Sequence, residues 1–304
     1  MITPWGDVRV SDAHVHFFSH RFLSLLAVQQ RAGASVADIA PLLGWEMPPE
    51  DPLNLANRWA GELDRHGVAR AALIASLPGD ESSVTAAIAA HPSRFLGYFM
   101  VNPTAQGALA AVEAALEAGL RGLCFFPAMH RYSMHDERAV ALLELAAARG
   151  GCLAFVHCGV LSVGVRAKLG LPSLFDLRYS NPLDLHALAL RYPRLPFAIP
   201  HFGAGMFREA LMLCDLCPNV YLDTSSGNSW MKYQEAGCDL VSVFRRALAV
   251  AGPERLLFGS DSSFFPRGWH RAVFDNQVAA LASLEIDEAA ARNILGANLE
   301  RILC

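Results

Sequence analysis

The segment Asp12-Ala13-His14-Val15-His16 ends the first strand-like stretch of the chain, residues 8–16. Successive side chains of a strand point to opposite faces, so we expect His14 and His16 on the same face. Two imidazoles on one face at the end of a strand can hold one metal ion. An isolated His-x-His is more often an ordinary pair of histidines, so the interpretation depends on the other strands.

Seven further stretches rich in β-branched or aromatic residues also predict strands. The eight predicted strands are residues 8–16, 69–77, 95–102, 120–126, 152–157, 197–201, 220–224 and 255–260. Patterns of apolar residues at helical spacing lie between them and predict helices at 55–65, 105–118, 136–149, 182–192, 205–216, 241–251 and 269–281. Alternating strands and helices indicate a parallel sheet. Eight such units in residues 1–304 predict a single (β/α)8 TIM-barrel domain, with an open doubly wound sheet as the alternative.

Three connections are longer than a barrel needs. They follow the first, fifth and seventh strands and comprise residues 17–54, 160–181 and 225–239. Loops that follow the carboxyl ends of the strands form the active-site face of a TIM barrel. We therefore expect these connections to shape a pocket, and residues 160–181 to cover its mouth as a lid.

The composition restricts the class of protein. The chain has 53% hydrophobic and 18% charged residues, which supports a large core rather than disorder. A net charge of −4 leaves no basic surplus for a nucleic acid. Long apolar stretches are interrupted and the N-terminus does not resemble a signal peptide, so neither a membrane span nor secretion is expected. Seven scattered cysteines predict reduced thiols and a cytoplasmic protein.

Ionisable residues end three more of the predicted strands. His157 ends the fifth strand, His201 ends the sixth, and Asp261 follows the eighth. Because the carboxyl ends of all strands of a barrel meet at one rim, we expect four histidines and one aspartate to converge there. Imidazole and carboxylate ligands suit Zn²⁺ best, with Mn²⁺ or Fe²⁺ as alternatives. A metal with an open coordination position lowers the pKa of water towards about 7.

The order of these motifs resembles the amidohydrolase superfamily, and within it the amidohydrolase-2 branch. That branch includes aminocarboxymuconate-semialdehyde decarboxylase and related hydrolases and decarboxylases. The motifs that carry the resemblance span nearly the whole chain: His14-Val15-His16, Val156-His157, Pro200-His201-Phe202-Gly203, Gly259-Ser260-Asp261 and Asn293-Ile294-Leu295-Gly296.

The resemblance also implies a set of metal ligands. Many relatives hold two metals bridged by a lysine on the fourth strand, but residues 120–127 offer no lysine or glutamate, which favours one metal. By resemblance, His14, His16, His157 and Asp261 bind a single divalent metal, and Asp261 also receives a proton from water. His201 then stands beside the water or the substrate and acts in catalysis rather than as a ligand.

The resemblance implies a metal-dependent hydrolase of a small lactone, ester or amide. The alternative on the same site is non-oxidative decarboxylation of an aromatic or dienoic acid by a carboxy-lyase. Two basic groups beside an apolar wall favour decarboxylation, whereas a hydrogen-bond donor aimed at a carbonyl favours hydrolysis. A binding protein on a barrel that has lost its activity is disfavoured, because all five rim residues are present.

Three further residues are candidates for substrate binding. Arg131 follows the fourth strand, Arg267 follows the eighth, and Trp230 lies in the long connection after the seventh. An arginine side chain suits a carboxylate or phenolate group. We expect a small-molecule substrate as the partner, and the oligomeric state stays open, with a homodimer as one option.

Overall fold

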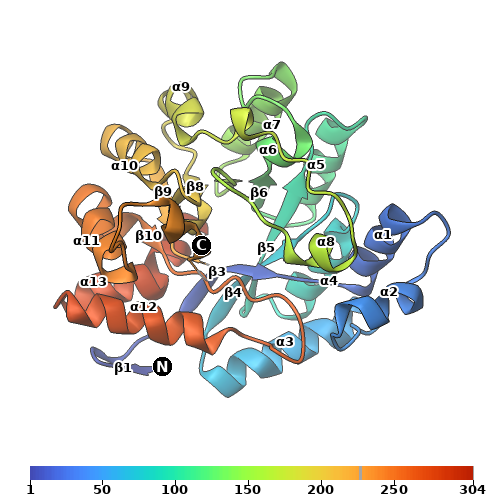
Figure 1. Cartoon of the computed structure of the whole chain (residues 1–304), viewed down its shortest axis with the longest axis horizontal. Helices are drawn as coiled ribbons and strands as arrows, with labels where there is room; N and C mark the ends of the chain where they lie inside the picture. The colour runs from blue at the N-terminus through green and yellow to red at the C-terminus, as the bar shows by residue number, and fades with distance from the viewer. Residues whose placement is uncertain (226–227, 304) are drawn as a thin grey trace.

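The computed structural model describes residues 1–225 and 228–303. Eight parallel strands form one sheet in which each strand pairs with its neighbours in sequence, and helices surround them (Figure 1). The strands are β3 (Ser11–His16), β4 (Arg70–Ala75), β5 (Phe95–Val101), β6 (Gly122–Phe125), β7 (Leu153–Val156), β8 (Phe197–Ile199), β9 (Val220–Asp223) and β10 (Leu256–Leu257). A small hairpin of β1 (Ile2–Thr3) and β2 (Gly6–Asp7) precedes them. The predicted TIM barrel and its eight strands are confirmed.

The barrel closes between β3 and the segment that follows β10. The backbone N–H of His16 donates to the carbonyl oxygen of Ser262 at 2.7 Å, and that of Asp261 donates to the carbonyl oxygen of His14 at 3.0 Å. Val15 and Ser262 form an isolated parallel bridge. This seam fixes Asp261 beside the two histidines of the first strand.

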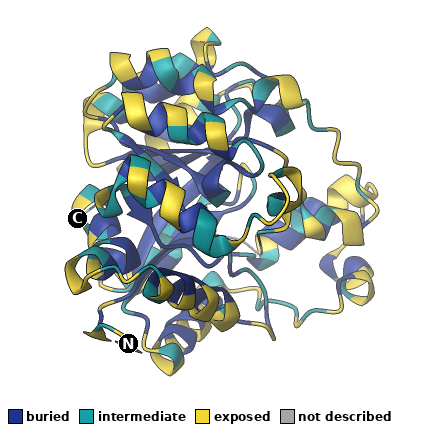
Figure 2. Ribbon diagram, turned by 60° about the vertical axis from the view of Figure 1, so that its left-hand side comes forward, coloured by how far each residue is buried: buried dark blue, intermediate teal, exposed yellow. Residues whose placement is uncertain are grey.

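Apolar side chains fill two layers, one inside the barrel and one between the strands and the helices. The inner layer includes Ala72, Ile74, Tyr98, Cys124, Phe155 and Ala198. In Figure 2 the strands and the inner faces of the helices are buried, whereas exposed residues lie on the outside. Burial of apolar surface stabilises the fold by roughly 25 cal/mol per Å².

Helices cover the outside of the barrel. In chain order they are α3 (Pro52–His66), α4 (Glu81–Ala90), α5 (Ala108–Glu117), α6 (Pro127–His130), α7 (Glu137–Arg149), α9 (His186–Arg191), α10 (Phe207–Leu216), α11 (Leu240–Ala251) and α12 (Arg271–Ser283). The sequence analysis missed α4, whose apolar stripe is weak because only Ser83, Val84 and Ala87 are buried. The predicted helix at 182–192 is divided into the 3-10 helix η2 (Pro182–Leu185) and α9.

The chain ends in three short helical segments, α13 (Glu288–Arg292), the π-helical η6 (Asn293–Ala297) and α14 (Asn298–Leu303). Asn298 ties them to the barrel, since its side-chain amide donates to the carbonyl oxygens of Pro253 at 2.7 Å and Leu256 at 2.8 Å. Among the helices of the described ranges, none is long and apolar enough to cross a lipid bilayer.

The long connections contain structure that the sequence did not predict. The one after β3 forms α1 (His20–Gln30) and α2 (Val36–Leu43), and Pro41 inside α2 obscures its helical pattern. The connection after β7 forms α8 (Gly164–Lys168), on the same side of the molecule as α1 and α2 (Figure 1). These three helices share a separate apolar cluster: Phe22, Leu26, Ile39, Leu43, Val165 and Leu169. The connection after β9 forms η4 (Ser229–Tyr233), and its residues 226–227 lie outside the described residues.

The turns that follow β7 and β8 touch each other through their backbones. The N–H of Val160 donates to the carbonyl oxygen of Ala204 at 2.8 Å. Gly159 has a φ of 76°, and a Cβ added there would collide with the carbonyl oxygen of Gly203. The close approach therefore requires glycine at this position.

We expect Gly159→Ala to lower the free energy of unfolding by about 1–3 kcal/mol beyond the cost of the positive φ, because the added methyl group overpacks the contact. Gly107→Ala is the matched control: Gly107 also has a φ of 76°, but an added Cβ there meets no described atom within 4 Å. Urea denaturation of both variants measures the difference. Equal losses of stability would contradict the close contact as the cause.

Candidate metal centre

His14 and His16 lie at the end of β3, where the register of pairing with β4 shifts between Asp12 and Val15. Their ring centroids are 5.1 Å apart. The Oδ1 atom of Asp261 lies 3.3 Å from His16 Nε2 and 3.8 Å from His14 Nε2. The backbone of Asp261 has a φ of 57°, a left-handed conformation that costs a residue with a side chain roughly 1–2 kcal/mol. Such strain persists where the surrounding structure enforces it, as at functional sites.

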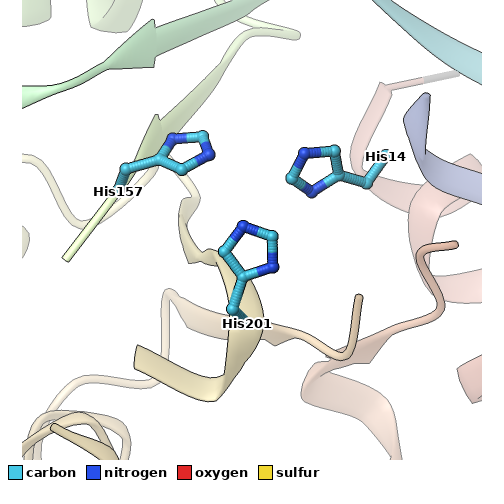
Figure 3. A group of neighbouring side chains, drawn as sticks. All are labelled: His14, His157 and His201. Carbon is cyan, nitrogen blue, oxygen red and sulfur yellow. The ribbon is translucent and has the colours of Figure 1, made fainter. Parts of the chain in front are cut away.

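His157 and His201 reach the same place from the other side of the barrel. His157 follows β7, and its ring stacks on Phe126 with a centroid distance of 3.8 Å. His201 does not continue the sixth strand as predicted, because β8 ends at Ile199 and His201 lies in the turn η3 (Pro200–Gly203) with a φ of 56°. Figure 3 shows the rings of His14, His157 and His201 turned towards one another.

Two overlapping groups of side chains are close enough to hold a metal ion. One group is His14, His157 and His201, and the other is His14, His16 and Asp261; within each group the ligand atoms lie within 4.8 Å of one another. The five residues that were expected to converge from separate strands therefore do meet at one rim. His14 belongs to both groups and is the centre of the arrangement.

The donor atoms fit a divalent metal. Within the described part of the chain, His14 Nε2 and His157 Nδ1 are buried and have no hydrogen-bond partner. A buried polar atom without a partner costs about 1–3 kcal/mol, and a metal ion would satisfy such a nitrogen. Imidazoles with one carboxylate suit Zn²⁺ and other first-row metals.

Burial and neighbouring charges set the protonation of these groups. Burial lowers the pKa of His157 well below its usual value, and it also lowers the pKa of His16 and of His201. Burial alone would raise the pKa of Asp261, but the hydrogen bond from His16 and the charge of His14 together hold that pKa below its usual range. Burial alone would lower the pKa of His14, but the neighbouring carboxylates of Asp223 and Asp261 raise it above its usual value. Neutral imidazoles and an ionised carboxylate are the forms that bind a metal, so metal binding at His14 would release a proton.

Polar residues behind the histidines were missed in the sequence analysis. Asp12 Oδ1 accepts the N–H of His14 at 2.9 Å, and its Oδ2 accepts the indole N–H of Trp269 at 2.7 Å. Asp223 ends β9 and lies behind His14, with its Oδ1 3.5 Å from His14 Nδ1. For Asp223 the sequence did carry a signal, an acidic residue at the end of an apolar strand, which is the signal that identified Asp261.

A cavity of about 330 Å³ opens beside the histidines. His16, His157, His201 and Asp261 line it. Aromatic rings form an apolar wall: Phe18 stacks on Phe22 at 4.2 Å and on Trp45 at 5.8 Å, and Trp45 stacks on Phe264 at 4.2 Å. A flat organic molecule could stack on this wall.

Basic side chains also line the cavity. Arg166 and Lys168 come from α8, and residues 161–165 of the same connection line the cavity as well. That this connection acts as a lid stays a prediction. Arg267 comes from the loop after β10; its guanidinium donates to Ser263 Oγ at 2.8 Å and lies over the ring of Phe264. Three basic side chains therefore contribute to the lining of the cavity beside the histidines and Asp261.

The other two proposed substrate contacts lie away from this cavity. Both Nε and Nη2 of Arg131 donate to the carbonyl oxygen of Leu174, and Arg131 faces a neighbouring hollow. Trp230 is only 4% exposed and packs against Phe202 and Phe207, so it supports the loop after β9 from within the core. The structure thus brings Arg267, but neither Arg131 nor Trp230, to the residues that line the cavity.

A TIM barrel with four histidines and an aspartate at its rim is the architecture of a metal-dependent hydrolase or a closely related enzyme. The chain belongs to the amidohydrolase family, whose sequence model matches residues 11–303.

Solved structures share the fold at low identity. A probable 2-pyrone-4,6-dicarboxylic acid hydrolase from Acinetobacter baumannii, with citric acid bound, is 14% identical with a TM-score of 0.61, over 97% of this chain and 99% of that one. An amidohydrolase from Burkholderia multivorans with bound zinc is 16% identical with a TM-score of 0.61, over 97% and 99%. Protein fluG of Emericella nidulans is 34% identical over 91 residues, which are 30% of this chain and 10% of that protein. The match thus spans about a tenth of the length of that curated relative.

We expect protein purified without chelator to hold one zinc ion per chain. His157→Ala should lose most of the metal because it removes a ligand, whereas His201→Ala should keep the metal because His201 acts beside it. His91→Ala, at the end of the outer helix α4, is the control for loss of a histidine. Elemental analysis measures all three. Equal metal loss from His157→Ala and His201→Ala would show that His201 is a ligand, and two ions per chain would contradict a single site.

Proposed function

We propose that the chain is a metal-dependent hydrolase of a small lactone, ester or amide that carries a carboxylate. One observation carries the proposal: the same cavity is lined by candidate metal-site residues and by basic side chains. The candidate metal-site residues are His16, His157, His201 and Asp261, and the basic ones are Arg166, Lys168 and Arg267. Positive charges that face a cavity favour an anionic ligand. The family match to amidohydrolases supports hydrolysis as the reaction.

His14, His16, His157 and Asp261 would hold the metal, with zinc as the ion that best suits these ligands. The zinc bound to the Burkholderia multivorans amidohydrolase supports this choice. A bound zinc ion supplies Lewis acidity and makes water a stronger acid. The remaining steps depend on side chains of this chain.

His201 and Asp261 are the groups that move a proton. His201 is neutral because burial lowers its pKa, so it can take a proton from the attacking water and return it to the leaving group. The low pKa of Asp261 keeps its carboxylate ionised, and burial opposes but does not overcome the contacts with His16 and His14. Arg267 binds the carboxylate of the substrate, and the Phe18–Trp45–Phe264 wall stacks on its flat part and excludes water.

Decarboxylation is the second candidate, and one observation favours it. The cavity has basic side chains beside an aromatic wall, and this arrangement favours an acid substrate that loses CO₂. The Acinetobacter baumannii protein, however, is a probable hydrolase of a dicarboxylic acid. The basic and aromatic lining of the cavity supports an anionic, flat substrate for either reaction, and the products distinguish hydrolysis from decarboxylation.

We expect the zinc-loaded protein to hydrolyse carboxylate-bearing lactones or esters with release of acid and without release of CO₂. A panel of such compounds and of aromatic carboxylic acids tests this, with acid release followed in a pH-stat and CO₂ in a coupled assay. The zinc-free protein is the control. Release of CO₂ without hydrolysis would replace the hydrolase by a carboxy-lyase.

Arg267→Ala should raise KM for an anionic substrate by roughly 10- to 100-fold, because a hydrogen bond to a charged group contributes about 1.5–3 kcal/mol. The KM for the matched uncharged methyl ester should change little. Arg138→Ala, which removes an exposed arginine of α7 that pairs with Asp136, is the control for loss of charge. Equal effects on both substrates would contradict a role in carboxylate binding.

A further inference from the structure

Ser225 lies between two imidazoles of the site and a carboxylate. Its Oγ is 3.0 Å from His14 Nδ1 and 2.9 Å from His201 Nδ1, and it donates a short hydrogen bond to Asp223 Oδ1. Ser225, Asp223 and His14 are all fully buried. Water therefore does not compete for these contacts, and the one hydroxyl group has three neighbours.

The carboxylate of Asp223 determines which way the hydroxyl group points. Asp223 Oδ1 accepts the backbone N–H groups of Ser225 at 2.9 Å and His201 at 3.4 Å. An oxygen atom that takes up these two hydrogens is the acceptor in its contact with the hydroxyl group as well. The hydroxyl group of Ser225 gives its single hydrogen to Asp223, so its oxygen offers only lone pairs to the imidazoles.

Each imidazole must then carry its own hydrogen on Nδ1. For His201, the backbone carbonyl oxygen of Ser225 lies 3.2 Å from Nδ1 and imposes the same requirement, since a carbonyl only accepts. A neutral imidazole that is protonated on Nδ1 keeps its lone pair on Nε2. His14 Nε2 is one of the buried nitrogens that find no hydrogen-bond partner in the described ranges.

We propose that Asp223 and Ser225 are positioning residues that fix His14 and His201 as Nδ1–H tautomers and direct both Nε2 lone pairs into the site. His14 can then bind the metal through Nε2, and His201 can receive a proton there. The roles of these lone pairs, in metal binding by His14 and in proton transfer by His201, rest on the proposed function. The tautomers themselves do not depend on it.

Two further observations agree with this arrangement. Ser76 makes the equivalent contacts to His16. Its hydroxyl group donates to the carbonyl oxygen of Ile74 at 3.1 Å and accepts from His16 Nδ1 at 2.7 Å. Gly259 leaves the space that the network needs, since an added Cβ would lie 2.5 Å from Asp223 Oδ2 and 2.9 Å from His14 Cβ. A side chain at position 259, just after β10, would therefore displace Asp223 or His14.

Nitrogen-15 spectra of the metal-free protein with labelled histidine test the proposal directly, because protonated and unprotonated ring nitrogens have different chemical shifts. In the wild type we expect His14 and His201 to be protonated on Nδ1. In Asp223→Ala the hydroxyl group of Ser225 loses its acceptor and turns to donate to His14 Nδ1, so His14 should become the Nε2–H tautomer. His201 should keep Nδ1–H, because the carbonyl of Ser225 remains.

Asp223→Asn is the conservative variant that should rescue the tautomer, since its amide oxygen can still accept at the Oδ1 position. Zinc affinity, measured by competition with a chelator, should fall by roughly 10- to 100-fold in Asp223→Ala and by much less in Asp223→Asn. Asp80→Ala is the matched control: Asp80 is also fully buried and accepts two serine hydroxyl groups, but it lies at the start of the outer helix α4. It should leave the His14 signals and zinc affinity unchanged.

An Nε2–H tautomer of His14 or His201 in the wild type would overturn the proposal, even if Asp223→Ala did not fold. An unchanged His14 spectrum in a folded Asp223→Ala protein would also overturn it. The expected tautomers in a zinc-loaded protein that hydrolyses nothing would refute the proposed function alone and leave the positioning role intact.

Discussion

The hydrogen-bonded seam between the first and the last strand is the contact on which the site depends. At this seam the N–H of Ala13 donates to the carbonyl oxygen of Phe258 at 2.8 Å, and Asp12 Oδ1 receives the N–H groups of His14 at 2.9 Å and Ser260 at 3.1 Å. Only closure of the barrel brings His14 next to a residue that lies almost 250 positions later in the chain, Asp261. The contacts that close the barrel thus also bring together three of the candidate metal ligands, His14, His16 and Asp261.

The seam also shows how buried charge is tolerated. Asp12 is fully buried, and burial raises its pKa to about 6 although Ser260, His14 and Trp269 donate hydrogen bonds to it. Removing a carboxylate from water costs several kcal/mol, which is recovered only where hydrogen bonds satisfy its oxygens. Asp12 meets this condition through the backbone N–H groups of His14 and Ser260 and the indole N–H of Trp269. Asp223 meets it at Oδ1 alone, because its buried Oδ2 has no hydrogen-bond partner among the described residues. Hydrogen bonds with buried groups hold His14 in place, which limits how far a bound metal could move it.

The sequence predicted those features that repeat along the chain. Alternating strands and helices have a local period, and an ionisable residue at the end of an apolar run is visible without a structure, as for His157 and Asp261. Features that depend on distant contacts were not visible. Ser225 is 211 positions away from His14, and no local pattern sets it apart from other serines. The turn that holds His201 has a left-handed backbone at a non-glycine residue, which reflects packing by its surroundings rather than a local preference.

The helices α1, α2 and α8, which we call the cover, form an apolar core of their own. The apolar cluster of α1, α2 and α8 is separate from the two clusters of the barrel, and it is held together partly by polar ties, such as Lys168 Nζ to the carbonyl oxygen of Leu43 at 2.9 Å. Arg166 and Lys168 belong to this cover, whereas Arg267 belongs to the rim of the barrel. Under the proposed function, residues of two cores would contact the substrate, while the histidines and Asp261 rest on the barrel alone. Substitutions in the cover would then alter substrate binding without disturbing the seam beside His14, as loop variation does in other TIM barrels.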